Sequence, residues 1–156
     1  MTRYALLIGQ IHQDLHDLER LVNQTMTLLQ KVKNTGDEDY LGTVALNLHS
    51  FYSGVERIFR ETARTVDGSI PEGADWHRRL LRQMSAEVAD VRPIVITDQT
   101  RNALDEYCAF RHVVRNVYTF DLRPKRVKEL TEALPNAYQL LLHDAQTFCK
   151  FLEAIA

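Results

Sequence analysis

The chain has 156 residues and a mass of 18.0 kDa, which suits one domain over residues 1–156. Its composition is 45% hydrophobic and 26% charged, with six glycines and four prolines. These values are those of a globular chain and exclude the disordered, collagen-like and disulfide-scaffold classes. The formal net charge is −2, so bulk charge does not make the whole molecule a polyanion binder.

The first segment carries a regular apolar stripe, which predicts one long helix over residues 3–33. Its apolar or near-apolar positions alternate steps of four and three residues: Tyr4, Ile8, Ile11, Leu15, Leu18, Val22, Thr25, Leu29 and Val32. This spacing is that of a heptad seam, and at 1.5 Å per residue the helix would be roughly 45 Å long. Such a helix suits a long element of a bundle, or one that also pairs with a second copy of itself.

The next two helices are separated by turn signals. Gly36 ends the first helix in the turn 34–39, and a helical apolar period then runs from Leu41 to a stop at 67–68. The loop 69–75 follows, and Asp75 would cap a third, shorter helix.

The second half of the chain predicts two more helices. Thr97 or Asp98 would cap a helix that runs to about Val117. Pro124 would occupy the first position of the last helix, and Pro135 would kink or split that helix near residue 134. No segment has the period of a strand. The expected fold class is therefore all-α, a bundle of four to five helices with a long N-terminal helix.

Several kinds of active site are missing from the sequence. It has no Gly-rich phosphate loop, no Gly-x-Ser-x-Gly and no His-Glu-x-x-His. His12 and His16 have a metal-ligand spacing, but two histidines do not make a site, so no metal or cofactor is expected. His49 lacks the nearby lysine of a histidine phosphotransfer module, and we interpret His77 and His143 as surface or boundary residues. The apolar run at residues 4–9 is too short for a signal sequence or a membrane span, so we expect a soluble, cytoplasmic protein that does not bind a membrane.

One stretch is strongly basic. Residues 111–128 contain six Lys or Arg and one acid, a local charge of +5, so the remaining 138 residues sum to −7. This asymmetry is typical of a surface that faces a polyanion. The candidate phosphate-binding or RNA-binding residues are Arg111, Arg115, Arg123, Lys125 and Arg126.

Two ridges of side chains meet at the start of this stretch. Arg111, Arg115 and Tyr118 share one helix face at i, i+4 and i+7, and His112 and Asn116 form the adjacent ridge. The plain structural interpretation is that the arginines form ion pairs with acids of a neighbouring helix, such as Glu56 or Glu61, while Tyr118 packs.

The motif resembles the Arg-x4-His-x-Tyr signature of HEPN domains of the HepT type. In this chain the aligned positions read Arg111, four residues, Asn116, Val117 and Tyr118. The long first helix, the pattern of residues 48–59 and the chain length agree with that family, so the resemblance covers most of the chain. HepT-type proteins are toxins encoded beside a minimal nucleotidyltransferase (MNT) antitoxin.

The resemblance implies how such a protein works. It implies a homodimer whose motif copies meet in a shared cleft, and metal-independent cleavage of RNA by an Arg and His pair. It also implies that the partner transferase silences the toxin by adding AMP to the motif tyrosine. Carried onto this chain, Arg111 would hold the phosphate and Tyr118 would be modified.

The chain departs from the family at Asn116, where the motif has histidine. An amide cannot exchange a proton near neutral pH, whereas His112 can. Three hypotheses therefore stay open. The protein is an active ribonuclease in which His112 replaces the missing histidine, with Arg111, His112, Asn116 and Tyr118 as its catalytic residues. Alternatively, it binds RNA or a nucleotide, or docks the transferase, through the same basic cleft without catalysis. In the third hypothesis it is a plain helical dimer.

Overall fold

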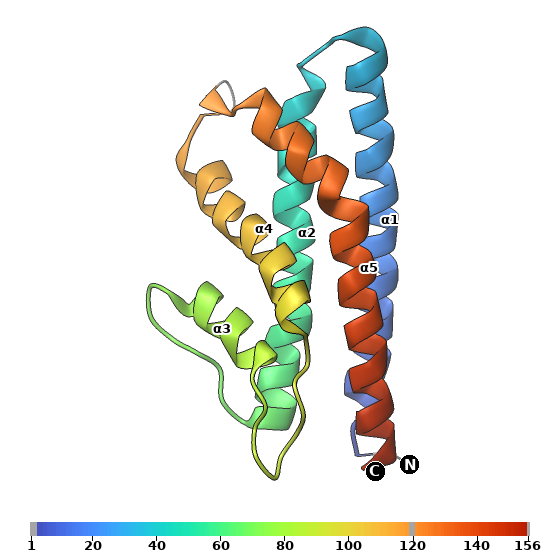
Figure 1. Cartoon of the computed structure of the whole chain (residues 1–156), viewed down its shortest axis with the longest axis vertical. Coiled ribbons are helices and arrows are strands. Elements are labelled where there is room, and N and C mark those ends of the chain that lie inside the picture. Colours follow the sequence, from blue (N-terminus) through green and yellow to red (C-terminus); the bar gives the residue numbers. More distant parts are fainter. Residues whose placement is uncertain (1–2, 119–120, 156) are drawn as a thin grey trace.

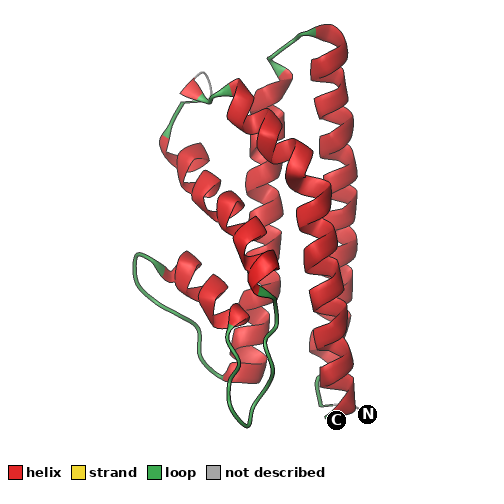
Figure 2. Cartoon of the chain, in the orientation of Figure 1, coloured by secondary structure: helices red, strands yellow, loops and turns green. Residues whose placement is uncertain are grey.

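The computed structural model describes residues 3–118 and 121–155, which are helical apart from their connections (Figures 1 and 2). The elements are α1 (Ala5–Thr35), α2 (Tyr40–Thr62), a π-helical turn η1 (Ala63–Asp67), α3 (Trp76–Ser85), α4 (Asp98–Asn116) and α5 (Pro124–Ala154). The described part of the chain contains no strand, only an isolated bridge between Val88 and Arg92. The predicted all-α bundle with a long first helix is confirmed.

The heptad seam of α1 lies in the core of its own bundle. From Tyr4 to Val32, every residue of the seam is buried, and α1 lies alongside α2 and α5 (Figure 1). Gly54 of α2 sits where the two helices approach closely, because a Cβ there would be 2.7 Å from Leu18. The residues of the seam are therefore buried by helices of the same chain. The seam does not itself indicate pairing with a second copy. No described helix is long and apolar enough to cross a bilayer.

The helix ends follow the predicted signals, with one exception. Gly36 closes α1 in the left-handed conformation at φ 70°, and Pro124 begins α5. Asp75 occupies the N-cap position of α3 as predicted, but its side chain makes no capping hydrogen bond. Pro135 does not split α5, which continues from Pro124 to Ala154 but changes direction along its length in Figure 1.

A buried carboxylate of α5 holds the start of α4. Thr97 caps α4, since its Oγ1 accepts from the backbone N–H of Thr100. Oδ2 of Asp144 accepts from the Thr97 N–H at 2.9 Å and from the Thr100 hydroxyl at 2.6 Å. These bonds fix the position of α4, which carries the basic motif at its other end.

A buried ion pair holds the segment that contains α3. Arg92 donates through Nε and Nη2 to the two oxygens of Asp67, at 2.6 and 2.8 Å. Its side chain also donates to the carbonyls of Gln83, Ala86 and Pro93. The Arg92 side chain is fully buried. This network ties the connection after α3 to the end of η1, and it sets where α3 lies against α2.

Replacing Asp67 with alanine should destabilise the fold strongly. Asp67→Ala leaves the buried Arg92 guanidinium without its counter-charge, and such losses cost about 3–5 kcal/mol. Asp105→Ala is the matched control because it removes the exposed partner of Arg78, which should cost less than about 1 kcal/mol. Urea unfolding followed by circular dichroism measures both free energies. Equal losses for the two variants would contradict this role of Asp67.

Candidate functional site

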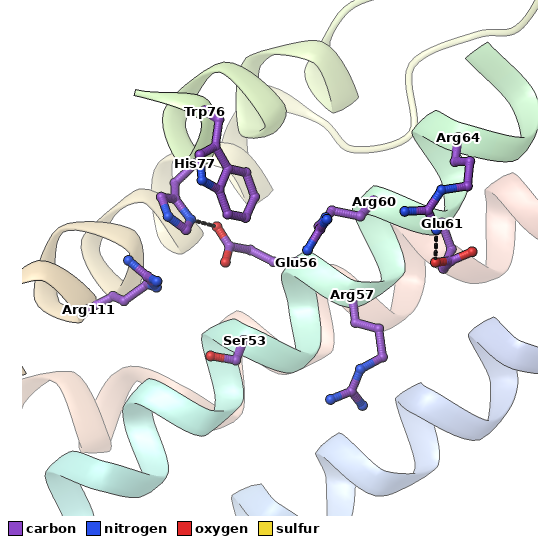
Figure 3. A pocket seen from close by; sticks show the side chains of 9 residues that line it. All are labelled: Ser53, Glu56, Arg57, Arg60, Glu61, Arg64, Trp76, His77 and Arg111. Carbon is purple, nitrogen blue, oxygen red and sulfur yellow. Dashed lines mark hydrogen bonds and ion pairs between the residues drawn. The ribbon is translucent and has the colours of Figure 1, made fainter. Parts of the chain in front are cut away.

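A pocket of about 370 Å³ opens between α2, α3 and α4, and Arg111 is its contribution from α4 (Figure 3). Six side chains come from α2 and η1, and two come from the start of α3. The lining residues are Ser53, Glu56, Arg57, Arg60, Glu61, Arg64, Trp76, His77 and Arg111. We call this the α2–α4 pocket.

The arginines of the pocket follow the helical period of α2. Ser53, Arg57, Arg60 and Arg64 are separated by steps of four, three and four residues, so they share one face of α2 and its π-helical extension. Adding Arg111 gives four guanidinium groups against two glutamates along the same walls. The pocket is therefore positively charged even before His77 is counted.

Both glutamates of the pocket are already engaged. The Nδ1 atom of His77 lies 2.5 Å from an oxygen of Glu56, and both side chains are largely buried. Glu61 pairs with Arg64, its neighbour one turn along. Arg57 lies 3.8 Å from Asp14 of α1, but the arginine is mostly exposed, so this pair is weak.

Of the four arginines that line the pocket, Arg60 and Arg111 have no carboxylate partner among the described residues. Arg60 lies over the Trp76 ring, with 5.2 Å from its Cζ to the ring centroid. In Figure 3 the two side chains point toward each other from opposite sides of the Glu56–His77 pair. The ion pairs of Arg111 with Glu56 or Glu61 that a purely structural motif would make are not formed.

His49 lies on α2 one turn before Ser53, near Arg111 and Arg115 of α4. Burial, followed by the positive charges of Arg111 and then Arg115, lowers the pKa of His49 below the usual histidine value. Its Nε2 atom is buried and has no hydrogen-bond partner among the described residues. The shift leaves more of the imidazole in the neutral form that can accept a proton, while the two arginines make it a weaker base than a free histidine.

His112 and Asn116 lie on the exposed side of α4. The Nδ2 group of Asn116 donates to the His112 carbonyl at 2.7 Å and lies 3.2 Å from Nδ1 of the His112 ring. Neither residue lines the α2–α4 pocket. The predicted ridge thus exists, but it lies outside the pocket that contains Arg111.

The remaining predicted residues lie outside the α2–α4 pocket, and two of them line a second hollow. Tyr118 follows the end of α4 and is 72% exposed. Arg123 and Arg126 line a hollow of about 510 Å³ beside Phe110, Val113 and Val117. Lys125 is exposed on the first turn of α5, and Arg115 is exposed on α4. The basic stretch is therefore divided between two faces of the molecule.

Apart from Arg111, no residue that lines the pocket was predicted from the sequence as a site residue. The signal was present, because the polar positions from His49 to Arg64 repeat at helical spacing within α2. The spacing does not show which helix packs opposite these residues, because α4 lies some fifty residues further along the chain. Across residues 3–118 and 121–155, no three histidine, cysteine or carboxylate side chains gather as metal ligands.

Comparison with known proteins gives one match. No curated protein and no solved structure matches the chain. A family model described as HepT-like protein matches residues 43–152, well over half of the chain and all of α3 and α4. The chain therefore belongs to the HepT-like family of HEPN-type, toxin-like proteins.

Proposed function

We propose that this protein is a metal-independent endoribonuclease, the toxin of a toxin–antitoxin pair. The observation that carries the proposal is Arg111, a half-buried guanidinium in a positive pocket with no carboxylate partner among the described residues. Such a group is suited to bind the phosphate of RNA and to stabilise the charge that develops during cleavage. Membership of the HepT-like family supports the same activity.

Cleavage without a metal needs proton transfer at two oxygens. One group takes the proton from the 2′-hydroxyl, which then attacks the adjacent phosphorus, and another protonates the leaving 5′-oxygen. The products are a 2′,3′-cyclic phosphate and a free 5′-hydroxyl. We propose His49 as the base, because its lowered pKa keeps the ring neutral beside Arg111. His112 remains the candidate acid, and Asn116 would orient its ring through the 3.2 Å contact between the amide Nδ2 and Nδ1 of the imidazole.

A second candidate function is RNA or nucleotide binding without cleavage, or docking of the transferase. It is favoured by Asn116, which replaces the motif histidine and whose side-chain amide donates to the carbonyl of His112 and lies near its ring. The same pocket would serve either function. The two candidates differ in one outcome, since a binding protein would hold RNA with a salt-dependent affinity and leave it intact.

Arg111→Ala should abolish cleavage. In EDTA, the wild-type protein should cut a mixed RNA substrate and leave 2′,3′-cyclic phosphate ends. Loss of the phosphate-binding cation should lower the rate by about 10²–10³-fold. Gel analysis of the products measures this loss. Arg20→Ala, an exposed arginine of α1, is the matched control and should cut as the wild type does.

One result would contradict the ribonuclease proposal. If unmodified wild-type protein binds the RNA and leaves it whole, the binding function replaces the proposed one. The intact mass of the protein must be measured first, because an AMP group on the protein would also prevent cleavage.

The pKa of His49 should rise when Arg115 loses its charge. Arg115→Gln removes one of the two cations that lower the pKa of His49, so the ring should hold its proton to higher pH. A base works only when neutral, so the acidic limb of the cleavage profile should move to higher pH with it. NMR titration of the His49 ring measures the shift. Arg123→Gln is the control, and an equal shift there would argue against a local effect.

Substitution of each histidine distinguishes the roles of His49 and His112. His49→Ala should slow cleavage by about 10²–10⁴-fold. If His49→Ala cuts normally and only His112→Ala fails, His112 is the working base and His49 is structural.

We also propose that an MNT-type nucleotidyltransferase silences the protein by adding AMP to Tyr118. The exposure of Tyr118, at 72%, supports this because an enzyme must reach the side chain. A homodimer in which two motif copies share a cleft fits the exposed Val113 and Val117 beside it.

Coexpression with an MNT-type nucleotidyltransferase should add AMP to the wild-type protein. Tyr118→Phe should prevent the addition, because the ring no longer carries the accepting hydroxyl. Intact-mass spectrometry followed by peptide mapping measures both. Tyr40→Phe, a half-buried tyrosine at the start of α2, is the control. AMP found on Tyr118→Phe protein would place the modification elsewhere.

A further inference from the structure

We propose that the α2–α4 pocket beyond Arg111 binds the phosphate groups of single-stranded RNA on one side of the cleaved bond, with Arg57, Arg60 and Arg64 as ligands. The proposal rests on RNA being the ligand of this protein, and it names a subsite that the motif does not contain. Its residues belong to α2, η1 and α3, outside the basic stretch of residues 111–128.

The first argument is the charge of the pocket. Four arginines and two glutamates line it, which leaves a net +2 with His77 neutral. The Glu56 carboxylate is held by His77, and Glu61 is held by Arg64. Neither acid therefore neutralises Arg60 or Arg111. Two uncompensated guanidinium groups in one pocket are suited to phosphate oxygens, which they can bind in a bidentate manner.

The second argument is the direction of the stripe. Ser53, Arg57, Arg60 and Arg64 line one side of α2 and η1 from the level of Arg111 onward. Eleven residues at 1.5 Å each give about 16 Å, a length that accommodates a few nucleotides of a single strand. A row of cations along a groove follows a chain of phosphates better than it encloses one small anion.

The third argument is the pair of aromatic rings that α3 contributes to the pocket (Figure 3). The Trp76 ring stacks on His77, with ring centroids 3.6 Å apart, and Arg60 lies over the same indole. Arg60 thus rests on an aromatic ring instead of on a carboxylate. It can move to a phosphate without breaking an ion pair, so binding costs less there.

Trp76 is the only tryptophan of the chain, and it reports on this pocket directly. We would titrate the wild-type protein in EDTA with a 2′-O-methyl RNA oligonucleotide, which cannot be cleaved, and follow Trp76 fluorescence. Anisotropy of a labelled oligonucleotide gives the affinity independently. A saturable fluorescence change is expected, and added salt should weaken it.

Arg60→Gln should bind the oligonucleotide about tenfold more weakly, and its salt dependence should fall by roughly one phosphate contact. Arg82→Gln is the matched control, since Arg82 is exposed on α3 and lies outside the pocket. It should bind within twofold of the wild type. Thermal unfolding of both variants checks that the fold is intact.

Three outcomes would overturn the proposal. The first is an Arg60→Gln variant that binds as tightly as the wild type. The second is an oligonucleotide that binds without changing Trp76 fluorescence. The third is inorganic phosphate or pyrophosphate binding as tightly as the oligonucleotide, which would make this a site for a free anion.

The test also separates this proposal from the ribonuclease. If RNA binds through Arg60 but is never cut, the subsite proposal stands and the ribonuclease proposal is wrong. If Arg60→Gln cuts RNA as well as the wild type does, the ribonuclease proposal stands and the subsite proposal is wrong.

Discussion

The hydrogen bond between Glu56 and His77 determines which arginines of the site are left without a carboxylate partner. At 2.5 Å, it joins α2 to α3 across 21 residues and engages the carboxylate that lies between Arg60 and Arg111. Without His77, Glu56 would be the natural partner of Arg111, and the arginine would serve only to hold two helices together. With it, the pocket keeps two cations for a ligand. An arginine without a carboxylate partner among the described residues is therefore the physical basis of the proposed phosphate-binding site.

Two buried networks keep that bond and Arg111 in place. Arg92 and Asp67 tie the segment after α3 to η1, which positions His77 over Glu56. Asp144 of α5 holds the first turn of α4, and the rigid helix then carries Arg111 to the pocket. The site is therefore assembled from four helical elements that are anchored at their ends, away from the pocket itself.

The sequence predicts the elements well because their signals are local. Helical periodicity, Gly36, Thr97 and Pro124 each act within a turn of their own position. Arg111 was found for the same reason, since its motif lies on one helix. The pocket was not found, because its walls are joined by contacts between α2, α3 and α4. Successive residues of a helix point in different directions, so His112 lies outside the pocket that contains Arg111. Arg123 and Arg126 line another hollow.

The most direct measurement is a crystal structure of the protein with 2′-O-methyl RNA, grown in EDTA. The account predicts a phosphate within hydrogen-bonding distance of the Arg111 guanidinium, with the His49 ring beside the 2′-oxygen. RNA bound elsewhere, with Arg111 paired to a carboxylate of its own chain or of a second copy, would contradict it.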